Sequence, residues 1–253
     1  MKIYGKNAVS ELIKSGKIRI KKVFLQMELK NNKDKFCSIL DEKNINYDFV
    51  PKNVLDAKAQ GARHQGVIAD VADFEYADLD NVIAQERKKQ KPLFFVILDC
   101  LEDPQNLGTI LRVCECAGVS GVIIPKNRSV LVNETVAKVS AGALFYVNVI
   151  KVNNIHQTIE DLKKQNVFVY AADMDGESMY KTSLIGDIAL VVGGEGNGVS
   201  ALTRKICDGI IQIPMFGQIN SLNASVSCGI TVFEVIRQRL ENEKKCWYRR
   251  NYR

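Results

Sequence analysis

The chain has 253 residues, of which 46% are hydrophobic and 25% are charged, with 17 Gly and 5 Pro. This composition is typical of a folded globular protein and excludes disordered, collagen-like and coiled-coil chains. No apolar run approaches the roughly 18–20 residues of a membrane span, and the first residues lack the apolar core of a secretory signal. We therefore expect a cytoplasmic protein with no membrane partner.

The cysteines and histidines give no pattern for a metal site. The seven cysteines have no paired C-x-x-C spacing, and the chain has only two histidines. A structural zinc site needs such pairs, so we expect no metal. The cysteines then act as reduced thiols, mostly as small apolar side chains.

Positive charge is concentrated at the two ends of the chain. Residues 1–35 carry ten Lys/Arg against three acids, and residues 244–253 carry five Lys/Arg, one Trp and two Tyr without an acid. Basic residues mixed with aromatic ones suit a polyanion with exposed bases, which favours nucleic acid as the partner. The alternative is a solvated surface and a frayed terminus.

The first part of the chain alternates helical and strand patterns. Helices are expected over residues 7–15, 33–43 and 53–60, and strands over 21–25, 47–50 and 66–71. Together they predict a small α/β domain over residues 1–76. The charged segment 77–91, which is followed by Pro92, predicts a linker.

The second part repeats this alternation on a larger scale. Its apolar runs lack strict alternation, which is typical of parallel strands that are covered on both faces. Strands are expected over 93–98, 121–124, 145–149, 167–171, 188–192 and 209–213, and helices over 107–117, 134–140, 154–165, 200–207 and 225–240. These elements predict a mostly parallel α/β domain over residues 92–243, followed by a basic tail over 244–253.

Ligands of open α/β sheets bind beyond the carboxyl ends of the strands, so the loops that follow strands are the first candidates. The loop after 188–192 holds four glycines around Glu195 in residues 193–198. It is not a dinucleotide fingerprint, because Val199 stands where the third Gly belongs, and no P-loop Lys follows. Such a loop lets a flat ligand approach the backbone closely, while the simpler reading is a tight turn.

Two further loops carry polar residues at the start of a helix. Asn106 and Arg112 surround the start of the helix expected over 107–117, and Asn223 and Ser225 precede or begin the last helix. Asn and Ser are common helix caps, so the spacing alone is equally consistent with capping.

In order and spacing, residues 106–112, 193–198 and 213–225 resemble the three signature motifs of the SpoU/TrmH family of RNA ribose 2′-O-methyltransferases, part of the SPOUT superfamily. Residues 5–9 and 64–66 resemble the substrate-binding domain of members that methylate guanosine in 23S ribosomal RNA. The resemblance implies S-adenosylmethionine as the cofactor and an N-terminal domain like ribosomal protein L30e. It also implies a C-terminal domain with a deep trefoil knot that forms a homodimer.

The resemblance also implies roles for single residues. The cofactor set, contacted mainly through backbone groups, is Gly193, Gly194, Ile213, Met215 and Leu222, and the catalytic set is Asn106, Arg112, Glu195 and Asn223. The high pKa of a guanidinium argues against Arg112 as a proton acceptor, so we expect it to hold the target phosphate and to stabilise oxyanion charge. From the charge pattern and the N-terminal motif, we expect RNA contacts at Lys21, Lys22, Arg63 and His64.

The expected function is therefore S-adenosylmethionine-dependent 2′-O-methylation of a ribose, in a guanosine of 23S ribosomal RNA. One alternative is a tRNA ribose methyltransferase of the same family, and the separate N-terminal module favours the ribosomal substrate. Another is a ribosome-associated RNA-binding protein without activity. The four polar residues at 106, 112, 195 and 223 argue against it, because a pure binder needs no cofactor loop.

Overall fold

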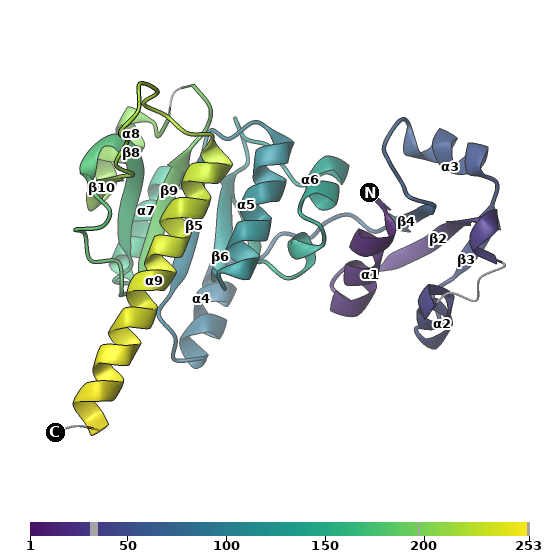
Figure 1. The fold of residues 1–253 in the computed structure, drawn as a ribbon, viewed down its shortest axis with the longest axis horizontal. Coiled ribbons are helices and arrows are strands. Elements are labelled where there is room, and N and C mark those ends of the chain that lie inside the picture. The colour runs from purple at the N-terminus through teal and green to yellow at the C-terminus, as the bar shows by residue number, and fades with distance from the viewer. Residues whose placement is uncertain (31–34, 197, 252–253) are drawn as a thin grey trace. The chain divides into compact units, whose positions relative to one another are not determined.

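The computed structural model describes residues 1–30, 35–196 and 198–251, with the backbone alone at 35 and 245–251 (Figure 1). It divides into two compact units. Unit 1 comprises Met1–Glu75 and Val132–Tyr146, and unit 2 comprises Tyr76–Leu131 and Val147–Arg253. Part of the helix predicted over 33–43, loop residue Asn197 and the end of the basic tail lie outside the described residues.

Unit 1 is built on a four-stranded sheet with the order β1-β4-β2-β3. Strand β4 pairs antiparallel with β1 and β2, whereas β2 and β3 are parallel. The strands are β1 (Lys2–Tyr4), β2 (Ile20–Gln26), β3 (Tyr47–Val50) and β4 (Val67–Val71), and the helices between them are α1 (Lys6–Ser15), η1 (Met27–Lys30), α2 (Lys35–Glu42) and α3 (Lys52–Ala59). The sequence predicts this mixed α/β unit but misses the three-residue β1.

Two elements from later in the chain complete unit 1: α6 (Glu134–Val139) and the 3-10 turn η2 (Ala143–Phe145). The carboxylate of Glu134 accepts hydrogen bonds from the Lys2 backbone N–H (3.0 Å) and from the Tyr4 hydroxyl (2.6 Å). Burial and this carboxylate raise the pKa of Tyr4. The sequence predicts instead that 132–146 belongs to the C-terminal domain. This prediction is wrong because a hydrophobic pattern does not specify which core a helix joins.

Unit 2 contains a six-stranded sheet with the order β10-β8-β9-β5-β6-β7, in which all neighbouring described strands are parallel. Its strands are β5 (Phe94–Asp99), β6 (Gly121–Pro125), β7 (Val149–Val152), β8 (Phe168–Ser178), β9 (Ile188–Gly193) and β10 (Gly209–Gln212). The predicted parallel α/β architecture is confirmed.

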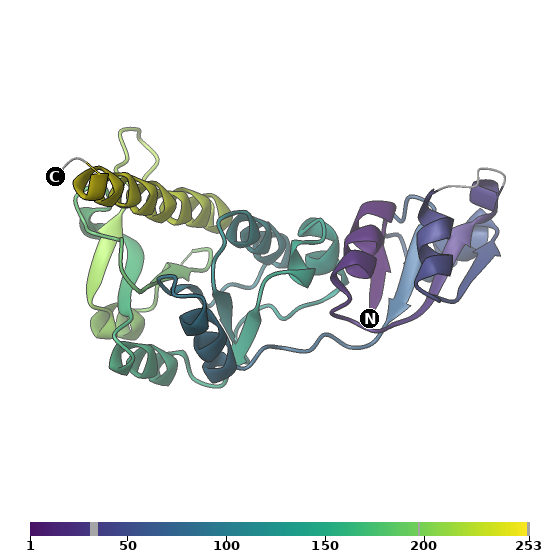
Figure 2. The same ribbon diagram turned by 90° about the horizontal axis from the view of Figure 1, so that it is seen from below.

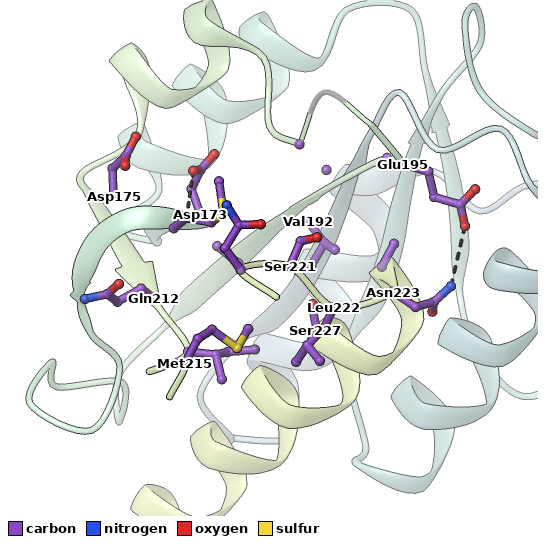
Figure 3. Close-up of a pocket in the computed structure, with 18 of the residues that line it drawn as sticks. Asp173, Asp175, Val192, Glu195, Gln212, Met215, Ser221, Leu222, Asn223 and Ser227 are labelled. Carbon is purple, nitrogen blue, oxygen red and sulfur yellow. Dashed lines mark hydrogen bonds between the residues drawn. The ribbon is translucent and has the colours of Figure 1, made fainter. Parts of the chain in front are cut away.

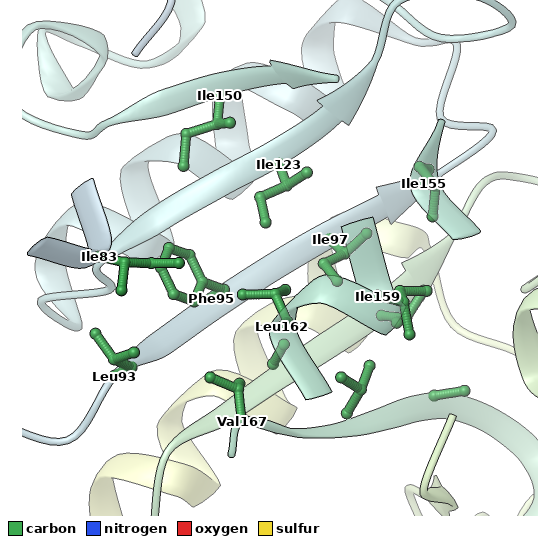
Figure 4. Close-up of a cluster of buried hydrophobic side chains, with 14 of the residues drawn as sticks. Ile83, Leu93, Phe95, Ile97, Ile123, Ile150, Ile155, Ile159, Leu162 and Val167 are labelled. Carbon is green, nitrogen blue, oxygen red and sulfur yellow. The ribbon is translucent and has the colours of Figure 1, made fainter. Parts of the chain in front are cut away.

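Helices cover both faces of this sheet, as Figure 2 shows. One face packs against α5 (Pro104–Cys116) and α9 (Ala224–Asn251), and the other against α4 (Leu79–Lys88), α7 (Ile155–Lys164) and α8 (Ala201–Ile206). The second face holds a cluster of buried side chains that includes Ile97, Ile159 and Leu162 (Figure 4). Burying each such side chain stabilises the fold by about 1.5–3 kcal/mol.

Three local predictions are wrong. The expected linker 77–91 contains helix α4, because Val82 and Ile83 are buried in the core among the charged residues. The strand expected over 145–149 begins only at Val149, after the turn η2. The predicted tail is not separate from the domain over residues 244–251, because α9 continues to Asn251 and residues 230–251 contain no Gly or Pro that would end it.

The strand order places a crevice beside the two central strands. From β5 the chain adds β6 and β7 on one side of the sheet, and then returns to build β8, β9 and β10 on the other. The order therefore reverses between β5 and β9, where Asp99 pairs in register with Gly193 at the carboxyl ends. Ligands of open α/β sheets bind at such a switch point.

Candidate active site

A cavity of about 920 Å³ opens beside the middle of β8 and the carboxyl ends of β9 and β10 (Figure 3). Its volume is in the range of small-molecule sites. All five residues expected to contact a cofactor lie in its wall: Gly193, Gly194, Ile213, Met215 and Leu222. The structure therefore brings together residues from two loops that are about twenty positions apart in the chain.

The glycines are needed first by the loop itself. A Cβ on Gly193 would lie 2.0 Å from the carbonyl carbon of Gly198, and one on Gly194 would lie 2.0 Å from the carbonyl oxygen of Cys100. Backbone therefore packs directly on backbone at both positions, and a side chain at either one would displace the cavity wall. The sequence suggests only that glycines leave room for a ligand.

Cys100 adopts a backbone conformation that favours glycine. Its φ is +57°, in the left-handed region, and it directly follows β5. For a residue with a Cβ this conformation costs roughly 1–2 kcal/mol. Cys100→Gly should therefore raise the free energy of unfolding by about 1 kcal/mol, once the greater chain entropy of glycine is included.

Denaturant unfolding would measure this gain. Cys100→Ala is the matched control, because it removes the thiol and keeps the Cβ, and it should leave stability nearly unchanged. Equal stability of the Gly and Ala variants would show that the left-handed backbone is not strained.

Three polar side chains from three elements meet at the edge of the cavity. Asn106 of α5 is 4% exposed, and its Nδ2 donates to Oε1 of Glu195 in the glycine loop. Asn223 donates from its Nδ2 to Oδ1 of Asn106 at 3.0 Å and to Oε1 of Glu195 at 3.4 Å, the contact drawn in Figure 3. This Asn106–Glu195–Asn223 cluster brings together one residue from each of the three predicted motifs.

Asn223 is also the cap of the last helix. Its Oδ1 accepts hydrogen bonds from the backbone N–H of Ser225 (2.9 Å), from the hydroxyl of Ser225 (2.6 Å) and from the backbone N–H of Val226 (3.3 Å). The capping bonds fix the orientation of the amide, so that its Nδ2 faces Asn106 and Glu195. The capping role and the site role are therefore compatible.

Arg112 does not join this cluster. It lies on α5, is exposed, and has no hydrogen-bond or ion-pair partner among the described residues. Six residues along a helix correspond to a rotation that leaves Arg112 about 120° from Asn106. Its guanidinium is thus open to a ligand that approaches from outside.

The sequence misses a charged group in the cavity wall. Arg204 of α8 pairs with Asp175 (3.0 Å) and lies 3.7 Å from the carboxylate of Asp173. Figure 3 shows both aspartates beside the cavity. Asp173 and Asp175 follow the strand predicted over 167–171, so their position after a strand is a signal that could have identified them. With Glu195, the wall carries three carboxylates and one guanidinium.

In unit 1, the two N-terminal motifs lie side by side. The backbone N–H of Gly5 donates to Val67 (3.0 Å), and a Cβ on Gly5 would lie 3.1 Å from Oε1 of Gln65. The loop Gly61–Gly66 lines a cavity of about 490 Å³ together with Lys52.

His64 and Arg63 have different positions in this loop. Arg63 is exposed, whereas His64 is 7% exposed and both of its ring nitrogens have partners. Its Nε2 lies 2.9 Å from Asp56, and its Nδ1 accepts from the Gly66 N–H at 3.0 Å. His64 therefore holds the loop in place, and the side chain of Arg63 is accessible to solvent.

Lys21 and Lys22 lie at the other end of β2. The residue paired with Lys22 is Asp70, whereas the Gly61–Gly66 loop adjoins Gln26. A strand rises about 3.3 Å per residue, so roughly 13 Å separates the two ends. Lys22 is also paired with Asp48 at 2.6 Å. The structure does not bring the four expected RNA contacts together.

The described residues contain neither a membrane-spanning helix nor a metal-binding cluster. No helix there is long and apolar enough to cross a membrane. No group of three or more His, Cys, Asp or Glu in that part of the chain could hold a metal ion.

Fold and site together define an α/β enzyme whose ligand cavity lies beside β8, β9 and β10 of a parallel sheet, next to its switch point. The model of the SpoU rRNA Methylase family matches residues 93–233, and the model of the RNA 2′-O ribose methyltransferase substrate-binding domain matches residues 2–77. A Staphylococcus haemolyticus protein assigned to the TrmH family of tRNA/rRNA methyltransferases is 44% identical over 242 residues, which cover 94% of this chain and 95% of that protein.

Solved structures share the fold. AviRb, a SpoU methyltransferase of Streptomyces viridochromogenes solved with its cofactor AdoMet, has a TM-score of 0.81 at 19% identity, over 95% of this chain and 90% of its own. The A. aeolicus TrmH/SpoU tRNA modifying enzyme has a TM-score of 0.56 at 27% identity, over 64% of this chain and 86% of its own. The chain belongs to the SpoU rRNA Methylase family and is an RNA methyltransferase.

Proposed function

We propose that this methyltransferase uses S-adenosylmethionine to methylate the 2′-hydroxyl of a ribose, in a guanosine of 23S ribosomal RNA. The observation that carries the proposal is the Asn106–Glu195–Asn223 cluster at the edge of the 920 Å³ cavity. It places polar groups that can orient a hydroxyl beside a pocket that can hold a nucleoside-sized methyl donor. An enzyme with this substrate would work in the cytoplasm.

The cavity suits S-adenosylmethionine in size and charge. The cofactor carries a sulfonium and an ammonium group, and the wall holds the carboxylates of Asp173, Asp175 and Glu195 against the single guanidinium of Arg204. Gly193 and Gly194 also line this cavity. When bound, the cofactor supplies a methyl group, and the products are the 2′-O-methyl ribose, S-adenosylhomocysteine and a proton.

The residues of the cluster would orient the acceptor. Asn106 and Asn223 hold Glu195 in one position, so that the incoming ribose meets a preorganised set of donors and acceptors. Arg112, open to the outside, would hold the phosphate of the target nucleotide and stabilise negative charge on the 2′-oxygen as the proton leaves.

One observation supports a ribosomal substrate over a tRNA. The N-terminal part of unit 1, Met1–Glu75, corresponds to the match to the substrate-binding domain over residues 2–77, whereas the A. aeolicus tRNA modifying enzyme covers only 64% of this chain. A separate module suits a structured stem-loop of ribosomal RNA.

The direct test is a map of ribose methylation in ribosomal RNA and tRNA from cells with and without this protein. Loss of one 2′-O-methylguanosine in 23S RNA is the expected result. Loss of a tRNA methylation instead would favour the alternative substrate, and no change in either RNA would contradict the proposal.

RNA binding by unit 1 should depend on salt and on its exposed cations. Each lost phosphate contact makes the slope of log affinity against log salt shallower by about 0.7–0.9. We propose the Gly61–Gly66 end as the principal contact, so Lys52→Gln with Arg63→Gln should change the slope by about 1.5. Filter binding of a ribosomal RNA fragment at several salt concentrations measures it.

The comparison is the double variant Lys21→Gln with Lys22→Gln, which changes the net charge equally at the other end of β2. Its slope should change less, because Lys22 is already paired with Asp48. Equal effects of the two double variants would extend the contact along the whole strand. A wild-type slope in both would remove unit 1 from RNA recognition.

We further propose that the protein is a homodimer that uses α9, in a domain with a deep trefoil knot. Val226, Phe233 and Leu240 recur every seven residues on this helix and are 48%, 48% and 53% exposed. Such an apolar stripe is typical of a helix that packs on a partner.

Phe233→Asp should therefore give a monomer at micromolar concentration in sedimentation experiments. Phe168→Asp, at another exposed phenylalanine, should leave the oligomeric state unchanged. A dimeric Phe233→Asp variant would exclude this face as the interface.

A further inference from the structure

One residue holds both ends of the glycine loop. The carbonyl of Asp99, the last residue of β5, accepts a hydrogen bond from the backbone N–H of Gly194 at 2.8 Å. Its carboxylate accepts another from the backbone N–H of Ser200 at 3.0 Å. Gly194 lies at the start of the loop and Ser200 lies just after it, so Asp99 holds both ends of the loop.

Asp99 is a buried charge without a cation. It is 6% exposed, and its partners among the described residues are the Ser200 N–H, the hydroxyls of Ser200 and Thr203, and the thiol of Cys100. Burial acts to raise the pKa of Asp99, but these hydrogen bonds outweigh it and the net shift is downward. The group is therefore ionised at neutral pH and accepts from donors that are neutral.

The hydroxyl partners of Asp99 connect the loop to the next helix, α8. Ser200 is the N-cap of α8, and its Oγ lies 2.7 Å from Oγ1 of Thr203. Thr203 is fully buried, and its Oγ1 also lies 3.2 Å from Nε2 of His156. Because these groups are fixed by their own neighbours, Asp99 ties the loop to a rigid part of unit 2.

The loop needs an external tie because of its composition. Glycines provide no side chain for packing, and each residue that is held in one conformation costs about 1–2 kcal/mol of backbone entropy. Between the two anchors, the loop carries Glu195 and the backbone that lines the cavity. Its shape before a ligand arrives therefore depends on the bonds to Asp99 together with those from Glu195 to Asn106 and Asn223.

We propose that Asp99 is a positioning residue for the methyl donor, which acts by holding loop residues 193–196 and 198–200 in their binding shape before the cofactor enters. The inference rests on the proposed function of this cavity. Without the carboxylate, the loop populates other shapes, and the apparent affinity falls with the fraction that remains competent. Asp99 touches neither donor nor acceptor in this account.

Asp99→Asn tests the proposal, because asparagine keeps the size and the backbone carbonyl but accepts fewer and weaker hydrogen bonds. We expect the KM for S-adenosylmethionine to rise about tenfold, while kcat at saturation stays within about twofold, because bound cofactor restores the loop. In the absence of cofactor, amide hydrogen exchange at 194–196 and 198–200 should be faster. Asp78→Asn is the control, because Asp78 accepts one backbone N–H as the cap of α4 and lies outside the cavity.

The outcomes separate the possible roles. A purely structural role would lower stability and the active fraction, and hence the apparent kcat, with KM and loop exchange unchanged, and this result would overturn the proposal. A wild-type KM together with wild-type exchange would overturn it as well. If the wild-type protein binds no S-adenosylmethionine in calorimetry, the proposed function fails, and the exchange experiment still reports whether Asp99 holds the loop.

Discussion

Gly193→Val should weaken the binding of S-adenosylmethionine by about a hundredfold. A Cβ at this position would lie 2.0 Å from the carbonyl carbon of Gly198 and 2.3 Å from the backbone nitrogen of Val199, on the opposite side of the loop. Neither atom can move without opening the loop that carries Glu195, and overpacking of this kind typically costs 1–3 kcal/mol or more. Titration calorimetry measures the loss directly.

The matched control is Gly186→Val. Gly186 also lies in unit 2, but its Cβ would meet no atom within 4 Å and its φ is not in the left-handed region. This variant should bind like the wild-type protein. Thermal unfolding of both variants separates a local change from global unfolding, because only the loop should be affected in Gly193→Val. Wild-type affinity in a folded Gly193→Val protein would show that the ligand does not use this wall.

The apolar runs of unit 2 were sufficient to predict its parallel sheet. Strand β5 is buried along its whole length and β9 at every residue but its last, so their sequences carry an unbroken signal. The signal fails where burial is partial. Helix α4 buries only Val82 and Ile83 in its first turns and ends in charged residues, which led to the linker prediction. Packing against the core decides such a segment, and packing is not visible in local composition.

The residues of the candidate site also fall into two groups, those that the sequence could predict and those that it could not. Residues that belong to a motif, such as Glu195 and Asn223, can be found by spacing, and the structure gives their contacts. Asp99 cannot be assigned in this way, because its contacts are with residues about 100 positions away in the chain. The position of Asp173 depends on a strand that continues beyond its apolar run. Long-range contacts of this kind depend on the strand order, which the sequence does not specify.

Arg112→Ala should reduce kcat by about a hundredfold to a thousandfold, the usual cost of losing one group that stabilises charge in the transition state. The structure predicts that this loss is confined to catalysis. Arg112 is exposed, has no partner among the described residues, and does not line the cofactor cavity. Stability should therefore change by less than about 0.5 kcal/mol, and the Kd for S-adenosylmethionine should not change.

The conservative variant distinguishes between two roles for the charge. Arg112→Lys keeps a cation but loses the planar fork that can hold a phosphate through two hydrogen bonds, so we expect it to recover less than a tenth of wild-type kcat. Lys88→Ala removes an exposed helical cation on the opposite face of the sheet and should leave the rate unchanged. Single-turnover methylation of a ribosomal RNA fragment at saturating cofactor measures all three. Full activity of Arg112→Lys would mean that a point charge suffices, and full activity of Arg112→Ala would place the stabilising group elsewhere, with the Asn106–Glu195–Asn223 cluster as the remaining candidate.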